Sequence, residues 1–168
     1  MCWYILRTRP SQEEKNQQLI QIIFRDLEII FPKRRLSWRK KGQIIDIIEP
    51  LFRGYLFVTT TNERIEELDL WLRVNRIEAQ LMKTDKKISQ ITSEEADLIS
   101  KLMCNGDIVE KSEIKKIGER VSIVSGPLVG LEGIIERFSK RNRRVTVRIT
   151  IGGEVKRVDL EGKWLNLE

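Results

Sequence analysis

Histidine is absent from this 168-residue sequence, and cysteine occurs only twice. The first absence removes the commonest general base and the commonest metal ligand of proteins. Cys2 and Cys104 form neither a CxxC pair nor a disulfide framework, which indicates a reducing setting and no structural zinc. A glycine-rich phosphate loop of the GxxxxGK[ST] type is also missing. We therefore expect no catalytic residues, no metal and no cofactor.

Long hydrophobic runs are missing as well. No apolar stretch approaches the roughly 18 residues of a membrane-spanning helix, and the first residues do not have the pattern of a signal peptide. The expected protein is therefore cytoplasmic, and it neither crosses a membrane nor is secreted.

Apolar and charged residues are abundant instead. Apolar residues make up 40% of the chain, which suits one ordinary domain or two small ones. Lysine and arginine total 31 against 25 acidic residues, so the net charge is +6 and the pI is near 9.4. This balance favours a polyanionic partner, although many basic proteins bind no nucleic acid.

The start of the chain predicts a strand followed by a helix. Residues 3–8 are typical of a strand. Ser11 and Glu14 have the spacing of a capping box, which predicts a helix from there to about Ile29. Pro32 would end this segment. The apolar residues that keep helical spacing, and would pack on a sheet, are Ile20, Ile23, Phe24, Leu27 and Phe31.

The following segments complete an α+β pattern, in which an antiparallel sheet is packed against helices. The expected elements are a hairpin over 33–48 turning at Gly42, a central strand, a helix capped by Asn62, a strand near 77–82, and a helix to about Met103 opened by a capping box of Thr92 and Glu95.

The last third of the chain changes character. Residues 104–117 are polar, lack sustained periodicity and are expected to form a linker. Residues 118–168 contain short period-two runs separated by glycine turns, which is the pattern of a small all-β barrel. Gly126, Gly130 and Gly133 fit turn positions where a side chain would clash.

The stretch from Glu49 to Val58, with the sequence EPLFRGYLFV, is central to the chain. Its aromatic and apolar run predicts a largely buried strand with an irregularity at Gly54. Together with Trp3–Leu6, it resembles the N-terminal domain of the NusG family of transcription elongation factors. The sequence of this stretch is most similar to that of the specialised NusG paralogues that act as antiterminators.

Residues 118–135, with the sequence GERVSIVSGPLVGLEGII, resemble the KOW motif of NusG and several ribosomal proteins. With the first resemblance, this one spans nearly the whole chain. The two together imply a NusG-type N-terminal domain over 1–103 that binds RNA polymerase, a linker over 104–117, and an SH3-like KOW barrel over 118–168 that binds nucleic acid.

The resemblance also implies a docking site for RNA polymerase. Phe52 and Tyr55 correspond to aromatic residues that dock onto the clamp helices of the polymerase, and an ordinary core strand is the alternative. Two features depart from the family pattern: Arg53 stands where proline is usual, and residues 73–78 lack the usual glycine. The first helix lacks the basic residues with which specialised paralogues read DNA, so no DNA-reading residues are assigned to it.

Basic residues cluster in the predicted hairpin with no acid among them. A solvated hairpin is the ordinary explanation. The functional alternative is that its tip faces RNA, or the DNA of the transcription bubble, because lysine and arginine gain free energy by releasing counterions from phosphates. The candidate contacts are Lys33, Arg34, Arg35, Arg39, Lys40 and Lys41.

A second basic cluster lies in the KOW region, where residues 137–148 contain no acid. A solvated loop is again the alternative, but cations this dense repel one another unless an anion faces them. Arginine can also form bidentate hydrogen bonds with phosphate or guanine. The predicted RNA-binding residues are Lys140, Arg141, Arg143, Arg144, Arg148, Lys156 and Arg157.

These patterns leave several functions open. The first is a monomeric, specialised antitermination factor that binds RNA polymerase through its N-terminal domain and a nascent RNA hairpin through its KOW domain. The second is a general NusG factor that couples polymerase to the ribosome or a termination factor; Gly152 counts against it, because general factors carry an aromatic residue at the matching position. An RNA-modifying enzyme with a KOW accessory domain is disfavoured by the missing histidine and cofactor motif, and a bystander domain without activity is the last alternative.

Overall fold

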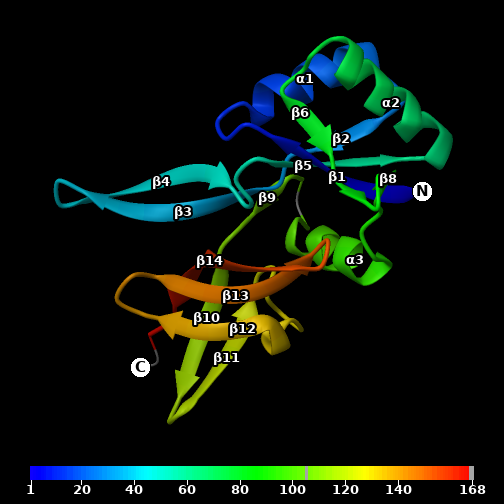
Figure 1. Ribbon diagram of the computed structural model, residues 1–168. Helices are drawn as coiled ribbons and strands as arrows, with labels where there is room; N and C mark the ends of the chain where they lie inside the picture. The colour runs from blue at the N-terminus through cyan, green and yellow to red at the C-terminus, as the bar shows by residue number, and fades with distance from the viewer. Residues whose placement is uncertain (105, 167–168) are drawn as a thin grey trace. The chain divides into compact units, whose positions relative to one another are not determined.

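The computed structural model describes residues 1–104 and 106–166, and the chain divides into two compact units (Figure 1). The first unit comprises Met1–Phe31 and Phe52–Ala96, and the second comprises Pro32–Leu51 and Asp97–Glu168. The segment 32–51 therefore belongs with the C-terminal strands, although it lies in the first third of the sequence. The predicted α+β class is confirmed.

A four-stranded sheet with the order β2-β5-β1-β6 forms the centre of the first unit. Its strands are β1 (Cys2–Thr8), β2 (Glu28–Ile30), β5 (Tyr55–Thr60) and β6 (Ala79–Leu81), and the small hairpin of β7 (Lys83–Thr84) and β8 (Lys87–Ile88) follows. β1 pairs antiparallel with β5 and β6, and β2 pairs antiparallel with β5. The expected antiparallel sheet is thus present.

Two helices, α1 (Glu13–Ile23) and α2 (Asn62–Val74), cover one face of this sheet (Figure 1). Because side chains alternate across a strand, every second residue of the central strands reaches these helices. The core contains Tyr4, Leu6, Leu56 and Val58 from the strands, Ile20, Ile65, Leu68 and Leu72 from the helices, and Phe24, the C-cap of α1. The opposite face carries the intervening residues, and this matters for the aromatic site described below.

Helix α3 (Ser93–Leu102) begins as predicted. The backbone N–H of Glu95 donates to Oγ1 of Thr92 at 3.2 Å, and the backbone N–H of Thr92 donates to Oε2 of Glu95 at 3.1 Å. These reciprocal bonds are the capping box inferred from the sequence.

The ends of α1 were predicted wrongly. Ser11 has a left-handed backbone with φ of 71°, and Gln12 is the N-cap without a side-chain cap bond. The helix ends at Ile23, and β2 follows where the prediction continued the helix. A short apolar run is compatible with either period, so its spacing alone could not separate the two. α2 also starts differently, since Thr61 rather than Asn62 is its N-cap.

A basic hairpin opens the second unit. β3 (Lys33–Lys40) pairs antiparallel with β4 (Gln43–Pro50), and parallel with β9 (Ile108–Val109). Lys41 and Gly42 join β3 to β4 with φ values of 50° and 78°, the conformation of a type I′ turn. The predicted hairpin and its turn are confirmed.

A curled five-stranded sheet with the order β11-β10-β14-β13-β12 forms the remainder of the second unit, consistent with the expected small barrel. Its elements are β10 (Ser112–Ile117), β11 (Arg120–Ser125), the 3-10 turn η1 (Glu132–Ile134), β12 (Ile135–Ser139), β13 (Arg144–Ile151) and β14 (Glu154–Trp164). β9 and β10 occupy much of the segment expected to be a linker. In the described part of the chain, no helix is long and apolar enough to cross a membrane.

The glycines expected at turns differ in what they contribute. Gly126 has φ of 98°, and a Cβ there would lie 2.6 Å from the carbonyl oxygen of Lys111, so no other residue fits. Gly130 is also left-handed, with φ of 78°, but a Cβ there would meet nothing within 4 Å, so the expected clash is absent. Gly133 was assigned wrongly, because its φ is not in the left-handed region and a Cβ would meet nothing within 4 Å.

Candidate nucleic-acid interface

Two basic turns of the second unit approach each other through one buried carboxylate, Glu161 of β14. The backbone N–H of Ser37 on β3 donates to Oε2 of Glu161 at 3.0 Å, and the Ser37 hydroxyl donates to Oε1. Nη1 of Arg144 donates to Oε2 of Glu161 at 2.6 Å, and its Nη2 donates to the Ser37 carbonyl oxygen at 2.7 Å. Glu161 is only 8% exposed. This cluster therefore holds the β3–β4 hairpin against the turn that joins β12 to β13.

The base of the hairpin has further intramolecular partners. Nη1 of Arg34 donates to the carbonyl oxygen of Asp159 at 2.6 Å, and Nη2 lies 3.3 Å from Oε2 of Glu49. Nε of Arg35 donates to Oε2 of Glu110 at 2.9 Å, and this hydrogen bond raises the pKa of the Arg35 guanidinium. Both arginines are engaged in holding the unit together.

The tips of both turns have the opposite character, because their cations are exposed. In the described part of the chain, Arg39, Lys40 and Lys41 at the tip of the hairpin form no ion pair or side-chain hydrogen bond. The same holds, over residues 1–104 and 106–166, for the exposed Lys140, Arg141 and Arg143 between β12 and β13. Six cations thus face solvent at two neighbouring tips.

Arg143 is held in an unfavourable backbone conformation. Its φ is 56°, and its backbone N–H donates to the carbonyl oxygen of Lys140 at 3.3 Å. Glycine or asparagine usually takes this position after a tight turn, because a Cβ in the left-handed region costs about 1–2 kcal/mol. Non-glycine residues in such conformations cluster at functional sites.

An open groove of about 480 Å³ lies between the two turns, and we call it the arginine groove. It is lined by Ser37, Trp38, Arg39, Ile44, Arg141, Asn142, Arg143, Arg144 and Asp159. Arg144 is already paired with Glu161, but the other three arginines face one aspartate, whose carboxylate accepts a hydrogen bond from Oγ1 of Thr146 at 2.6 Å. The lining is therefore strongly positive.

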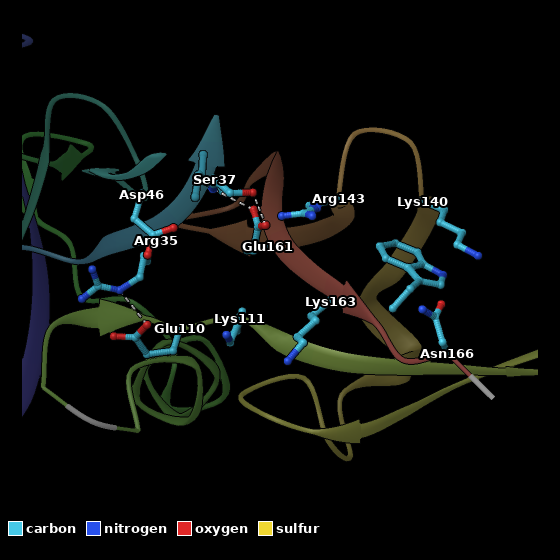
Figure 2. A pocket seen from close by; sticks show the side chains of 12 residues that line it. Arg35, Ser37, Asp46, Glu110, Lys111, Lys140, Arg143, Glu161, Lys163 and Asn166 are labelled. Atoms are coloured by element: carbon cyan, nitrogen blue, oxygen red, sulfur yellow. Dashed lines mark hydrogen bonds and ion pairs between the residues drawn. The ribbon is translucent and has the colours of Figure 1, made fainter. Parts of the chain in front are cut away.

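A second hollow of about 460 Å³ shares Ser37 and Arg143 with the arginine groove. Figure 2 shows paired Arg35 and Glu110 toward one end of it and Lys140 toward the other. Its charged lining consists of Arg35, Lys111, Lys140, Arg143, Lys163, Asp46, Glu110 and Glu161. Because acids offset much of this positive charge, the arginine groove is the better site for an anion.

The remaining predicted cations lie along the strands. Arg148 and Arg157 are directly opposite each other on β13 and β14. Nε of Arg157 lies 2.9 Å from Oε2 of Glu136, and Nζ of Lys156 lies 3.3 Å from Oε2 of Glu154. Arg148 is exposed, four residues or about 13 Å along the strand from Arg144. The predicted set is thus divided between the turn and the middle of the sheet.

The predicted aromatic site lies in the first unit, on the sheet face opposite α1 and α2. Phe52 precedes β5 rather than lying on it, and it is 5% exposed, with its ring 6.3 Å from that of Tyr55 and 6.2 Å from that of Phe57. Tyr55 is partly exposed, and the guanidinium carbon of Arg7 lies 5.7 Å from its ring centre. Tyr55 is therefore accessible from solvent, and its ring packs against the buried ring of Phe52.

A buried acid that the sequence reasoning missed fixes this turn. Oε1 of Glu13 accepts a hydrogen bond from the backbone N–H of Gly54 at 2.8 Å, and Glu13 is 3% exposed. The Gly54 carbonyl oxygen accepts from the backbone N–H of Thr8 at 2.7 Å. Gly54 has φ of 77°, so the expected irregularity is confirmed. Nothing local marked Glu13, since a glutamate in the first turn of a helix is usually solvated.

The described residues contain no group of three or more side chains that could hold a metal ion. The features that stand out are an exposed basic surface on one unit and a supported aromatic on the other. Both are suited to binding macromolecules.

Residues 1–100 match the family model described as "Transcription termination factor nusG", so this chain belongs to the NusG family. It is a transcription termination/antitermination factor of that family and not an enzyme.

Three curated relatives extend the similarity beyond the family model. Each is a "Transcription termination/antitermination protein NusG", from Rickettsia typhi, Rickettsia prowazekii and Rickettsia conorii, with identities of 19%, 21% and 20%. Each alignment covers 94% of this chain and 85% of the relative. The similarity therefore includes the C-terminal sheet as well as the sheet with α1 and α2.

Proposed function

We propose that this chain is a specialised antitermination factor, which binds RNA polymerase through residues 1–103 and a nascent RNA hairpin through its KOW barrel, residues 118–168. The observation that carries the RNA assignment is the β12–β13 turn. Lys140, Arg141 and Arg143 are exposed there without an acidic partner in the described part of the chain. Phosphates are the anions that such a cluster would bind with release of counterions.

Several features favour a structured RNA over a plain polyanion. The turn projects three cations from a paired β-hairpin, and Asn142 adds an amide among them. Arginine can read a guanine edge or stack on an unpaired base in an RNA loop. Arg144 serves a different purpose, since its guanidinium is taken up by Glu161 and Ser37. The exposed neighbours of Arg144 therefore carry the contact.

Tyr55 and Phe52 form the proposed dock for the clamp helices of RNA polymerase. A partly exposed aromatic beside an arginine offers a partner helix both apolar area and a donor. Phe52 contributes by holding the Tyr55 ring in place, because the two rings are in contact and Phe52 is buried. The names of the three relatives and the family resemblance support this role in transcription.

The turn between β13 and β14 supports a specialised rather than a general factor. Gly152 and Gly153 form it with φ values of 58° and 81°, and neither presents a side chain to a partner. General NusG factors resembling this chain carry an aromatic residue at the position of Gly152, and use it to contact the ribosome. A general factor that couples polymerase to the ribosome or a termination factor is the second candidate, supported by the names of the relatives.

Tethering would make a modest RNA affinity sufficient. RNA reaches the factor as it leaves the polymerase on which residues 1–103 are bound, so its effective concentration is high. The protein would act there as a monomer in the bacterial cytoplasm. The exposed hairpin cations Arg39, Lys40 and Lys41 would face the same RNA or the DNA of the transcription bubble.

A salt series with the full chain tests the RNA assignment. Binding to an RNA stem-loop should weaken steeply with salt, and Arg141→Ala with Arg143→Ala should lower the log–log slope by about one per lost phosphate contact. Lys116→Ala, which removes an exposed cation elsewhere on the same unit, is the matched control. Equal affinities of the double variant and the wild type would refute the assignment.

Co-purification with RNA polymerase tests the dock. Tyr55→Ala should abolish co-purification and leave RNA affinity unchanged, because the two surfaces lie on different units. Retained polymerase binding by the folded variant would show that this aromatic is not the dock.

A further inference from the structure

Trp38 has no part in the proposed function as stated so far. It lies on β3 opposite Ile45 and is 50% exposed. In the described part of the chain, its ring is in contact with no other aromatic ring. A half-exposed indole leaves much of its apolar area in water, which is unfavourable, and Arg39 beside it on the strand adds a positive charge.

The surroundings of Trp38 are those of a nucleotide site. It lines the arginine groove with Arg39, Ile44, Arg141, Asn142 and Arg143. The volume of about 480 Å³ falls within the range of roughly 300–1,000 Å³ that is usual for small ligands. An aromatic face with convergent arginines is what proteins use to hold single-stranded nucleic acid.

We propose that the arginine groove takes one unpaired nucleotide of the bound RNA, with its base stacked on Trp38 and its flanking phosphates on Arg141 and Arg143. Ile44 would pack beside the base, and the Asn142 amide can donate to and accept from a base edge. Electrostatics alone would bind any strand. The indole adds a preference for a base that is free to leave its helix, as in a bulge or a loop.

This inference rests on the proposed RNA binding and gives the buried cluster a purpose. Trp38 and Arg39 come from β3, whereas Arg141 and Arg143 come from the β12–β13 turn. The groove is complete only while the two elements are joined, and Glu161 joins them through Ser37 and Arg144. The buried ion pair of Arg144 and Glu161, with Ser37, therefore holds together the two elements that form the groove.

Fluorescence and affinity measured together on the full chain test the proposal. The probes are an RNA stem-loop with one bulged nucleotide, the same RNA with an abasic bulge, and the same stem without a bulge. Wild type should bind the bulged RNA more tightly than the other two, by about 5- to 160-fold, and its indole emission should be quenched. Trp38→Ala should lose this preference, and Trp38→Phe should keep most of it without the quenching.

Two control variants separate the possible outcomes. Trp71→Phe, which alters a partly buried indole of the first unit, should leave both the preference and the quenching intact. If Trp38→Ala binds all three RNAs as the wild type does, while Arg141→Ala and Arg143→Ala weaken binding, the nucleotide site is refuted and the proposed function stands. If none of these variants changes RNA affinity, both the nucleotide site and the proposed RNA binding are refuted. A DNA stem-loop with the same bulged nucleotide is the last probe, and an equal preference for it would overturn the assignment to RNA.

Discussion

The aromatic turn at residues 52–55 and the basic turn at residues 140–143 are both short connections with candidate binding residues, yet they are built in opposite ways. The aromatic turn is tied down, because Glu13 and Thr8 bond both polar backbone groups of Gly54. Its glycine takes the left-handed position. The basic turn places Arg143 in the same region of φ and leaves its cations without partners in the described part of the chain.

This difference is the one that the two proposed partners would require. A helix of a protein partner buries apolar area, which favours a preformed surface whose aromatics are already in place. A phosphate chain supplies the missing charge itself, so a cluster of unpaired cations is stabilised only when the partner arrives. Local strain and like-charge repulsion are thus concentrated in the second turn. The following substitutions test this comparison.

The largest expected effect is on the buried cluster behind the basic turn. Glu161→Ala removes the acceptor of Ser37 and Arg144, leaving a largely buried guanidinium without its carboxylate. The free energy of unfolding in urea should fall by about 3–5 kcal/mol. Glu119→Ala, at an exposed position, should change it by no more than about 0.5 kcal/mol. A loss at Glu161 as small as that of the control would show that the cluster does not stabilise the unit.

The next effect concerns the aromatic turn. Gly54→Ala places a Cβ 2.9 Å from the carbonyl oxygen of Thr8 at φ of 77°, whereas Gly42→Ala has nearly the same φ of 78° and open space. Gly54→Ala should lower the free energy of unfolding by about 2–3 kcal/mol, and Gly42→Ala should lower it by about 1 kcal/mol. Thermal unfolding of both variants measures the difference, which isolates the backbone contact. Equal losses would mean that the turn tolerates a shift.

Arg143→Gly should change stability and binding in opposite directions. Removing the Cβ relieves the strain of the left-handed backbone. Glycine also makes the unfolded chain more flexible, which offsets part of this stabilisation. The free energy of unfolding should therefore rise by up to about 1 kcal/mol. RNA affinity should fall together with its salt slope. Arg141→Gly, where φ is not positive, should lose both stability and affinity. A destabilised Arg143→Gly would contradict the account of strain.

The smallest expected effect at neutral pH involves Tyr4, which lies on β1 and pairs with β5, the strand that follows the aromatic turn. Burial, with the nearby Cys2 thiol, raises the pKa of Tyr4 from 10.0 to about 12. Because the folded state favours the neutral phenol, its contribution is complete below about pH 10 and is lost as the pH rises through about 12. Urea unfolding across this range should show the loss in the wild type, and Tyr4→Phe should flatten it. If the free energies of unfolding of wild type and Tyr4→Phe fall in parallel with pH, the alkaline loss of stability arises from other groups.

Local patterns in the sequence predicted much of the fold. The capping box of Thr92 and Glu95 and the turn at Gly42 depend on neighbouring residues alone, and both appear as expected. β2 was missed because a short apolar run fits either a helix or a strand. In the structure, the Gln21 side chain donates to the carbonyl oxygen of Leu27 at 2.6 Å beyond the end of α1.

The candidate sites were less predictable, because their supports come from distant residues. Glu13 and Glu161 resemble ordinary surface acids, and their partners lie 41 and 124 residues away. The charge pattern predicted the same role, RNA binding, for both Arg143 and Arg144. Only the fold separates them, since one guanidinium faces solvent and its neighbour is bound to Glu161.

The wide separation of Ser37 and Glu161 has a consequence for how the chain is made. At synthesis rates of about 5–20 residues per second, the 124 residues between them take roughly 6–25 seconds to follow. During that interval the β3–β4 hairpin can form from local contacts, while the strand that anchors it does not yet exist. The hairpin is therefore synthesised well before Glu161, the carboxylate of β14 that anchors it.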